Sequence, residues 1–238
     1  MSITCRLCGN SSLVSVLDLG ASPPCESFLS EEQLDLPEAT YPLHLRLCPD
    51  CLLLQIPALI TPEDTFGGDY AYYSSYSTSW VEHARKFVDQ AVDALGLDPD
   101  GFVVEVAAND GYLLQHVVNR GIRCLGIEPS VNCSEAARAK GIPMLRAFLD
   151  EALAARVRDE HGPADLVVAN NVFAHIPDIT GFAAGLRGLV ADTGRVSIEV
   201  HHALSLITAA QFDTIYHEHF QYWTVLAARH GLAAGGLR

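Results

Sequence analysis

Short apolar segments alternate with helical ones between residues 101 and 200, and no other feature of the sequence restricts the fold as strongly. Near-continuous apolar runs are typical of strands that are buried on both faces of a sheet. These runs are "FVVEVAA", "RCLGIEPS", "ADLVVANNV" and "RVSIEV", with a further strand expected in "IPMLRAF". The segments between them have helical spacing: "YLLQHVVNRG", "CSEAARAKG", "LDEALAARVRDEHG" and "DITGFAAGLRGLVADTG". The alternation predicts an α/β fold with a doubly wound parallel sheet.

Residues that follow the strands are the first candidates for a binding site, because ligands of such sheets bind beyond the carboxyl ends of the strands. Gly111 in "EVAANDG" allows a close backbone approach, and Glu128 in "GIEPS" is placed to accept hydrogen bonds from a ribose diol. A dinucleotide site would need glycines where Ala107 and Asn109 stand. We therefore expect a nucleoside without phosphates, and S-adenosylmethionine (SAM) fits this description.

Four cysteines in two C-x-x-C pairs mark the N-terminal part of the chain. The pairs "CRLC" and "CPDC" are separated by thirty-nine residues. Two such pairs supply a closed shell of four thiolates, which is typical of structural zinc; the alternative is four buried thiols without metal. The segment between the pairs has little core of its own, so zinc would contribute on the order of 10 kcal/mol to its folding. The predicted zinc ligands are Cys5, Cys8, Cys48 and Cys51.

An aromatic, serine-rich connector joins this part to the sheet. The sequence "PEDTFGGDYAYYSSYSTSW" precedes a predicted helix, for which Ser79 and Glu82 form a capping box. We therefore divide the chain into a zinc-binding module (1–60), a connector with a helix (61–100) and a cofactor-binding domain (101–238).

The segment "FDTIYHEHFQYW" gathers proton-handling side chains near the C-terminus. If it is helical, Tyr216 and His219 share a face with Phe212 and Trp223. A histidine of neutral pKa suits a general base. An isolated histidine would more often be structural, and metal binding by "HEH" is disfavoured because no third ligand is evident.

The net charge restricts the partners that we expect for this protein, and its N-terminus and apolar runs restrict its expected location. A formal net charge of −14 disfavours nucleic acid and anionic membranes as partners. The N-terminus does not have the pattern of a signal peptide, and no apolar run is long enough to span a membrane. Seven cysteines without such a signal indicate a reducing compartment. We expect a cytoplasmic protein that binds small molecules.

Six segments in this order resemble the SAM-dependent C-methyltransferases of deoxysugar biosynthesis, which carry an N-terminal zinc module. The segments are "CRLCG…CPDC", "YYSSYSTSWVEHAR", "VVEVAANDGYLLQ", "LGIEPS", "VVANNVFAHIPD" and "QFDTIYHEHFQY". The resemblance implies a class I (Rossmann-like) methyltransferase fold, SAM as cofactor and structural zinc. It also implies that the substrate is a nucleotide-linked keto-deoxysugar, for which we expect dTDP as the nucleotide. The expected context is the biosynthesis of deoxysugars for antibiotics.

The same resemblance implies roles for individual residues. His219 would remove a proton next to the ketone, so that the resulting enolate attacks the SAM methyl group, with Tyr216 and Glu218 lining the site. The residues expected to bind SAM are Asn109, Asp110, Gly111, Glu128, Pro129, Ser130, Asn171 and Tyr72. Spacing alone does not separate Tyr72 from its neighbours Tyr70, Tyr73 and Tyr76.

The sequence departs from the family pattern at two places. After "YHEHFQYW" the chain is expected to be shortened and to lack the C-terminal sugar-nucleotide domain of the family. His201 stands where the family pattern leads us to expect proline. Two other functions therefore stay open: a SAM-binding or scaffold protein without catalytic activity, and a methyltransferase that acts on oxygen or nitrogen of a small metabolite.

Overall fold

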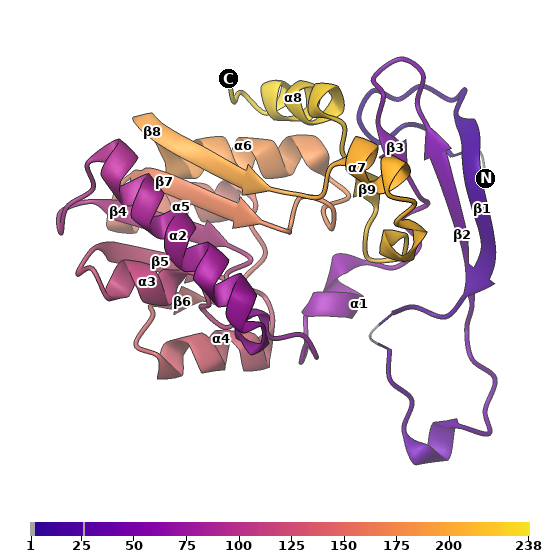
Figure 1. The fold of residues 1–238 in the computed structure, drawn as a ribbon, viewed down its shortest axis with the longest axis horizontal. Coiled ribbons are helices and arrows are strands. Elements are labelled where there is room, and N and C mark those ends of the chain that lie inside the picture. The colour runs from indigo at the N-terminus through magenta and orange to yellow at the C-terminus, as the bar shows by residue number, and fades with distance from the viewer. Residues whose placement is uncertain (1–2, 26) are drawn as a thin grey trace.

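The chain folds around two β-sheets, which lie at opposite ends of the molecule (Figure 1). A computed structural model describes residues 3–25 and 27–238. The larger sheet has the strand order β6-β5-β4-β7-β8, and every neighbouring pair is parallel. Its strands are β4 (Phe102–Val106), β5 (Arg123–Ile127), β6 (Met144–Leu145), β7 (Ala164–Asn170) and β8 (Val190–Glu199). This arrangement confirms the predicted doubly wound parallel sheet.

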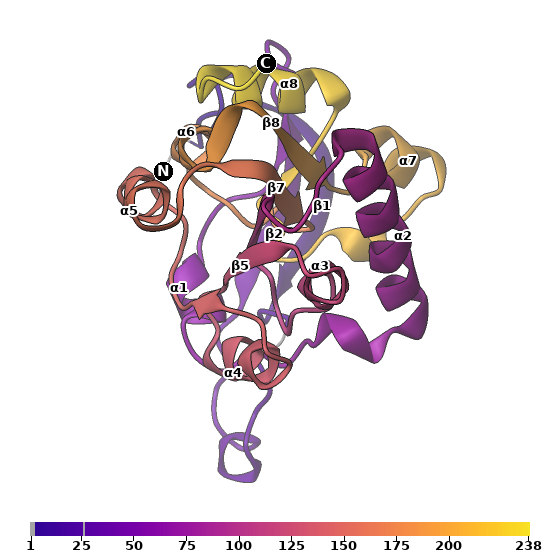
Figure 2. The ribbon, with the colours of Figure 1, turned by 90° about the vertical axis from the view of Figure 1, so that its left-hand side faces the viewer.

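Helices cover both faces of the parallel sheet (Figure 2). One apolar cluster joins the sheet to α2, α3 and α4, and a second joins it to α5, α6 and α8. Because both faces are covered, the central strands β4 and β7 are buried along almost their whole length, which explains their largely apolar sequences. The helices are α2 (Thr78–Leu95), α3 (Leu114–Val118), α4 (Val131–Ala139), α5 (Glu151–His161), α6 (Ile179–Leu189) and α8 (Val225–Ala234).

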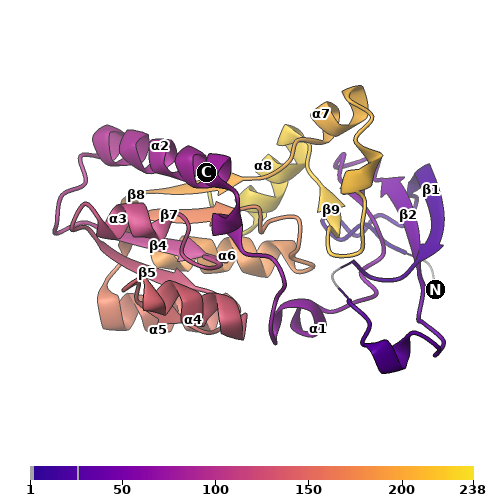
Figure 3. The ribbon, with the colours of Figure 1, turned by 60° about the horizontal axis from the view of Figure 1, so that its bottom comes forward.

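The smaller sheet combines strands from the two ends of the chain. Its order is β1-β2-β3-β9, in which Leu54 and Gln55 of β3 pair with Tyr222 and Gln221 of β9 (Figures 1 and 3). The segment that follows "YHEHF" is therefore part of the N-terminal sheet. The strands are β1 (Val14–Ser22), β2 (Tyr41–Leu47), β3 (Leu54–Gln55) and β9 (Gln221–Tyr222).

Short helical elements connect these parts. They are η1 (Glu31–Gln33), α1 (Pro62–Phe66), η2 (Ser74–Tyr76), α7 (Ala203–Thr208) and η3 (Phe212–Thr214). Among the residues that the structure describes, no helix combines the length and apolar character needed to cross a bilayer.

Two local predictions are wrong. Helix α2 begins at Thr78 and is capped by Ser77, whose Oγ accepts from the Trp80 N–H, so Ser79 lies inside the first turn and is not the N-cap. The segment 212–223 is not a helix: η3 leads through a turn into β9. Long-range contacts override the local spacing here, because Trp223 is buried and donates to the Phe173 carbonyl, whereas Phe212 is 62% exposed.

Candidate active site

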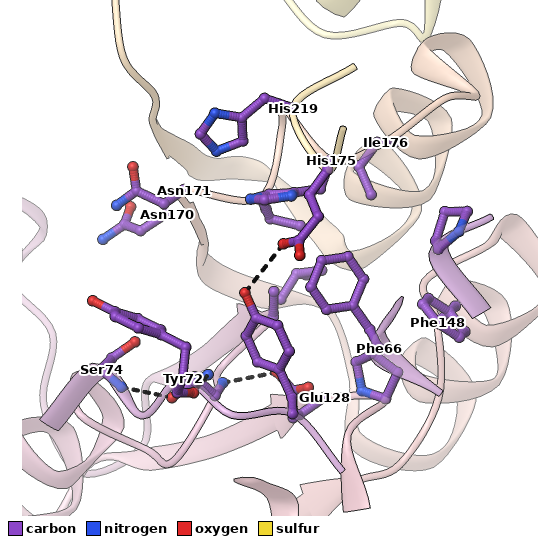
Figure 4. Close-up of a pocket in the computed structure, with 18 of the residues that line it drawn as sticks. Phe66, Tyr72, Ser74, Glu128, Phe148, Asn170, Asn171, His175, Ile176 and His219 are labelled. Carbon is purple, nitrogen blue, oxygen red and sulfur yellow. Dashed lines mark hydrogen bonds between the residues drawn. The ribbon is translucent and has the colours of Figure 1, made fainter. Parts of the chain in front are cut away.

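A cavity of about 740 Å³ lies at the carboxyl ends of β4, β5 and β7. Figure 4 shows Glu128, Tyr72 and Ser74 on one side of it and Asn170, Asn171, His175 and His219 on the other. The predicted site residues that line the cavity are Tyr72, Asn109, Glu128, Pro129, Asn171, Tyr216, Glu218 and His219. The structure therefore brings the end of the second strand together with the histidine-rich segment.

Glu128 is buried at the end of β5, where its carboxylate is held in one orientation. The Asn109 N–H donates to Oε2 at 2.9 Å, and the Ser130 N–H donates to Oε1 at 2.8 Å. Burial raises the pKa of Glu128, and these two N–H groups oppose that shift. A carboxylate oxygen has more than one acceptor site, so Glu128 can also accept from a diol in the cavity.

Asn109 and Asp110 fasten the aromatic connector to the sheet. Asn109 accepts from the Ser74 N–H at 2.8 Å and donates to the Tyr72 carbonyl at 3.1 Å. The carboxylate of Asp110 accepts from the Ser75 hydroxyl. These contacts hold the connector as one wall of the cavity, so its tyrosines are placed by side chains that follow β4.

The four connector tyrosines take different positions. Tyr70 and Tyr72 line the cavity, and the Tyr70 hydroxyl donates to Glu218 Oε2 at 3.4 Å across it. Tyr73 and Tyr76 stack on one another at 5.2 Å and do not line it. The spacing of the sequence could not make this distinction.

Three predicted cofactor residues lie outside the cavity wall. Asp110 accepts a hydrogen bond from the connector and forms an ion pair with Lys140, whose ammonium lies 3.1 Å from Asp110 Oδ2. Gly111 has a φ of +77°, and a Cβ there would lie 2.3 Å from Ile142 Cδ1, so this glycine permits close packing behind the loop. Ser130 is buried as the residue preceding α4. Asp110, Gly111 and Ser130 shape the site from behind.

His219 and Tyr216 form a hydrogen-bonded pair at the opposite wall. Nδ1 of His219 lies 3.0 Å from the Thr214 carbonyl, which only accepts, so Nδ1 carries the proton. Nε2 therefore has the lone pair, and the Tyr216 hydroxyl donates to it at 2.7 Å. The Tyr216 hydroxyl therefore occupies the nitrogen of His219 that can accept a proton, and both residues line the cavity.

Three imidazoles lie together in this wall. The ring centroids of His175 and His201 each lie 4.7 Å from that of His219. Burial, followed by the neighbouring His175 and His201, lowers the pKa of His219 to about 2, and burial lowers the pKa of His175 to about 4. Burial also lowers the pKa of His201. All three rings are neutral at pH 7.

Acid is expected to destabilise the protein partly through His219. The unfolded chain binds a proton at this residue near pH 6.5 and the folded chain does not, so the free energy of unfolding falls as the pH drops below that value. For His219 the loss between pH 7 and pH 5 is up to roughly 2 kcal/mol. Urea unfolding at both pH values should show a smaller loss for His219→Gln. His161→Gln, at an exposed position on α5, should keep the wild-type dependence; an unchanged slope in His219→Gln would contradict the assignment.

The N-terminal module holds the histidine-rich segment in place. Arg6, inside the first C-x-x-C pair, donates to the Phe220 carbonyl at 3.0 Å and to the Ile56 carbonyl at 2.8 Å. Phe220 directly follows His219. Leu43, Leu45 and Ile56 also form a buried cluster with Ile215 and Tyr222.

The four cysteines of the two C-x-x-C pairs lie together and can hold one metal ion. Their sulfur atoms all lie within 4.8 Å of one another. The Sγ atoms of Cys5 and Cys51 are 3.4 Å apart, those of Cys8 and Cys48 are 3.5 Å apart, and none is in a disulfide. Four thiolates around one point fit tetrahedral zinc and leave no open position. Cys25 lies apart from this group and lines the cavity.

The charges of the cavity wall favour a cationic ligand. Three carboxylates line it, those of Glu128, Asp213 and Glu218. Among the described residues that line the cavity there is no lysine or arginine. A wall of this kind attracts a positive centre and repels an uncompensated phosphate.

Sequence reasoning did not identify several residues of the wall. Asn170 is the last residue of β7, and its buried Oδ1 has no hydrogen-bond partner among the described residues. The rule that ligands bind at carboxyl strand ends would have found it. No sequence pattern marked Phe66 on α1 as a site residue, because only the packing of α1 brings it to the cavity.

Comparisons with known proteins agree with these observations. A family model described as a putative zinc binding domain matches residues 5–66, and one described as a methyltransferase domain matches residues 80–238. The C-methyltransferase NovU of Streptomyces niveus is 34% identical over 233 residues, which are 96% of this chain and 55% of that protein. The chain thus spans about half the length of this curated relative.

A solved structure shares the fold. The crystal structure of a SAM dependent methyltransferase from Archaeoglobus fulgidus matches with a TM-score of 0.52 and 14% identity, over 65% of this chain and 69% of that one. This likeness concerns the arrangement of the sheet and its helices.

Proposed function

This chain belongs to the methyltransferase family, since the model of that domain matches more than half of its residues, and from this premise we propose that it is a SAM-dependent C-methyltransferase of a nucleotide-linked keto-deoxysugar. The observation that carries the proposal is one cavity that is lined both by the buried carboxylate of Glu128 and by the hydrogen-bonded Tyr216–His219 pair. The similarity to a C-methyltransferase supports carbon as the acceptor atom.

The cavity has groups that suit each part of SAM. The cofactor supplies an electrophilic methyl group on a positively charged sulfur. Glu128 would accept from the ribose hydroxyls, Pro129 would border the adenosine, and Asn109 would fix Tyr72 and Ser74 beside it. The buried Oδ1 of Asn170 is an acceptor that a cationic amino group would satisfy. The carboxylates of the wall favour the cofactor's positive sulfur.

His219 would be the general base. Its neutral imidazole has the lone pair on Nε2, so it can take a proton from the carbon next to a ketone, either after Tyr216 turns aside or through the Tyr216 hydroxyl. Burial disfavours the imidazolium that results, and the enolate formed beside it compensates by its negative charge. The Tyr216 hydroxyl and Glu218 would bind the sugar next to the reacting carbon.

The nucleotide of the substrate would bind at the cavity mouth rather than inside it. The described lining residues have no cation to neutralise a diphosphate. We therefore assign the keto-sugar ring to the interior beside His219, and the diphosphate to the outside.

Zinc would stabilise the N-terminal module. The four clustered thiolates form a closed set of ligands, so the metal would have a structural role and take no part in methyl transfer. This role is consistent with the putative zinc binding domain that matches residues 5–66.

A transfer assay tests the proposal. The protein is incubated with methyl-¹³C-labelled SAM and a set of dTDP-linked and other nucleotide-linked 4-keto-6-deoxysugars, and the products are examined by NMR. A new carbon-bound methyl group on the ring next to the ketone is expected. Label on oxygen or nitrogen would support the alternative methyltransferase, and SAM binding without transfer would support the scaffold function; either result would refute the proposal.

Glu128→Gln is expected to weaken SAM binding by about 10- to 100-fold, as loss of hydrogen bonds to a charged group costs roughly 1.5–3 kcal/mol. Isothermal titration with SAM measures the change. Glu135→Gln, at an exposed position on α4, is the matched control and should bind SAM like the wild type. Equal affinity of Glu128→Gln and the wild type would remove Glu128 from the cofactor site.

A further inference from the structure

His201 lines the cavity beside His219, at a position where the family resemblance gave no expectation of histidine. It lies between the end of β8 and the start of α7. Its ring centroid is 4.7 Å from that of His219 and 5.5 Å from that of Tyr222. Its Nε2 is buried and has no hydrogen-bond partner among the described residues. A buried imidazole nitrogen without a partner costs free energy unless a ligand satisfies it.

The other two imidazoles of the cluster each bond to the backbone. Nδ1 of His219 is used by the Thr214 carbonyl, which leaves a lone pair on Nε2. A backbone hydrogen bond to Glu218 uses His175, whose Nδ1 is buried without a partner. A proton on Nε2 of His175 would serve that backbone bond and leave Nδ1 as an acceptor.

His201 differs from both, because no described residue fixes its tautomer. Its ring can therefore carry the proton on the nitrogen that faces a ligand and still be neutral. It is the member of this three-histidine cluster that can offer an N–H to an oxygen in the cavity.

The proposed reaction needs such a donor. When the base takes the proton, the C–H bond breaks and its electron pair moves onto the ketone, whose oxygen becomes negative. The electrons then form the new carbon–carbon bond as the methyl group leaves sulfur, and the ketone is restored. A donor aimed at that oxygen stabilises the charge only while it exists, which is how a preorganised group accelerates such a step.

We propose that His201 is a catalytic residue that donates a hydrogen bond to the enolate oxygen. The inference rests on the proposed function, since it assigns this role within the same site. It assigns stabilisation of the enolate oxygen to His201 and removal of the proton next to the ketone to His219.

Proton exchange measures this step without methyl transfer. The protein is saturated with S-adenosylhomocysteine in deuterated water, and NMR follows deuterium at the carbon next to the ketone of a nucleotide-linked 4-keto-6-deoxysugar. His201→Phe should slow the exchange by about 10²–10³-fold, the usual cost of one oxyanion donor. His201→Gln retains an N–H near the position of Nε2 and should recover much of the rate.

Controls separate this role from a structural one. His230→Phe, at an exposed position on α8 outside the cavity, should exchange like the wild type. Thermal unfolding and SAM titration verify that each His201 variant is folded and binds cofactor. Equal rates for wild type and a folded His201→Phe, or no recovery in a folded His201→Gln, would overturn the inference while leaving the function intact. A wild type that neither exchanges nor methylates any ketone would refute both.

Discussion

His219→Gln is expected to lower the rate of methyl transfer by about 10²–10⁴-fold, which is the usual contribution of a general base. Glutamine can accept from the Tyr216 hydroxyl but cannot take up a proton at neutral pH. The ring contacts with His175 and His201 would be lost, yet Glu128 lies at the other wall and is unchanged. Rates with labelled SAM and the keto-sugar measure the loss, and SAM titration should give the wild-type affinity.

A comparison with Tyr216→Phe shows which group meets the substrate. If the Tyr216 hydroxyl relays the proton to His219, both variants should lose rate to a similar degree. If Tyr216 only orients the imidazole, Tyr216→Phe should retain most of the activity. A His219→Gln variant that methylates at the wild-type rate would remove His219 from the mechanism.

Loss of one zinc ligand is expected to have the second large effect. Cys48→Ser should abolish zinc binding and destabilise the N-terminal module by up to on the order of 10 kcal/mol, because metal binding of such a module is coupled to its folding. Metal analysis and thermal unfolding measure both changes. Methyl transfer should fall as well, because β3 pairs with β9 two residues beyond His219 and Arg6 holds the Phe220 carbonyl.

Hydrogen exchange would show whether the damage reaches the active site. The amide of Phe220, which donates to the Ala174 carbonyl at 2.9 Å, should lose protection in Cys48→Ser. Cys25→Ser is the matched control for zinc content and stability, since Cys25 is exposed and lies outside the four-cysteine group. Unaltered stability of the zinc-free protein would contradict a structural role of the metal.

Much of the fold could be predicted because it depends on local periodicity. Continuous apolar runs occur where a strand is buried on both faces, and both faces of β4 and β7 are covered by helices. Glu128 could be found because strand ends in a parallel sheet meet at one edge. The four cysteines could be grouped because a C-x-x-C turn brings two thiolates to one point.

The histidine-rich segment shows where this reasoning fails. Its spacing suggested a helix, but the burial of Trp223 and pairing with β3 impose a turn and a strand. Tyr216 and His219 nevertheless meet, through a turn in which the His219 N–H donates to the Tyr216 carbonyl at 3.0 Å. Contacts with residues that are distant in the sequence, Phe173 and strand β3, thus determined the local structure.

The sequence by itself determined the parallel sheet, the grouped thiolates and the strand end that carries Glu128, because each follows from neighbours along the chain. Only the tertiary structure decided that the N-terminal sheet supports His219, that Tyr70 and Tyr72 rather than Tyr73 and Tyr76 line the cavity, and that His201 lies beside the base. These arrangements depend on the packing of segments that are distant in the sequence. The periodicity within one segment carries no information about that packing.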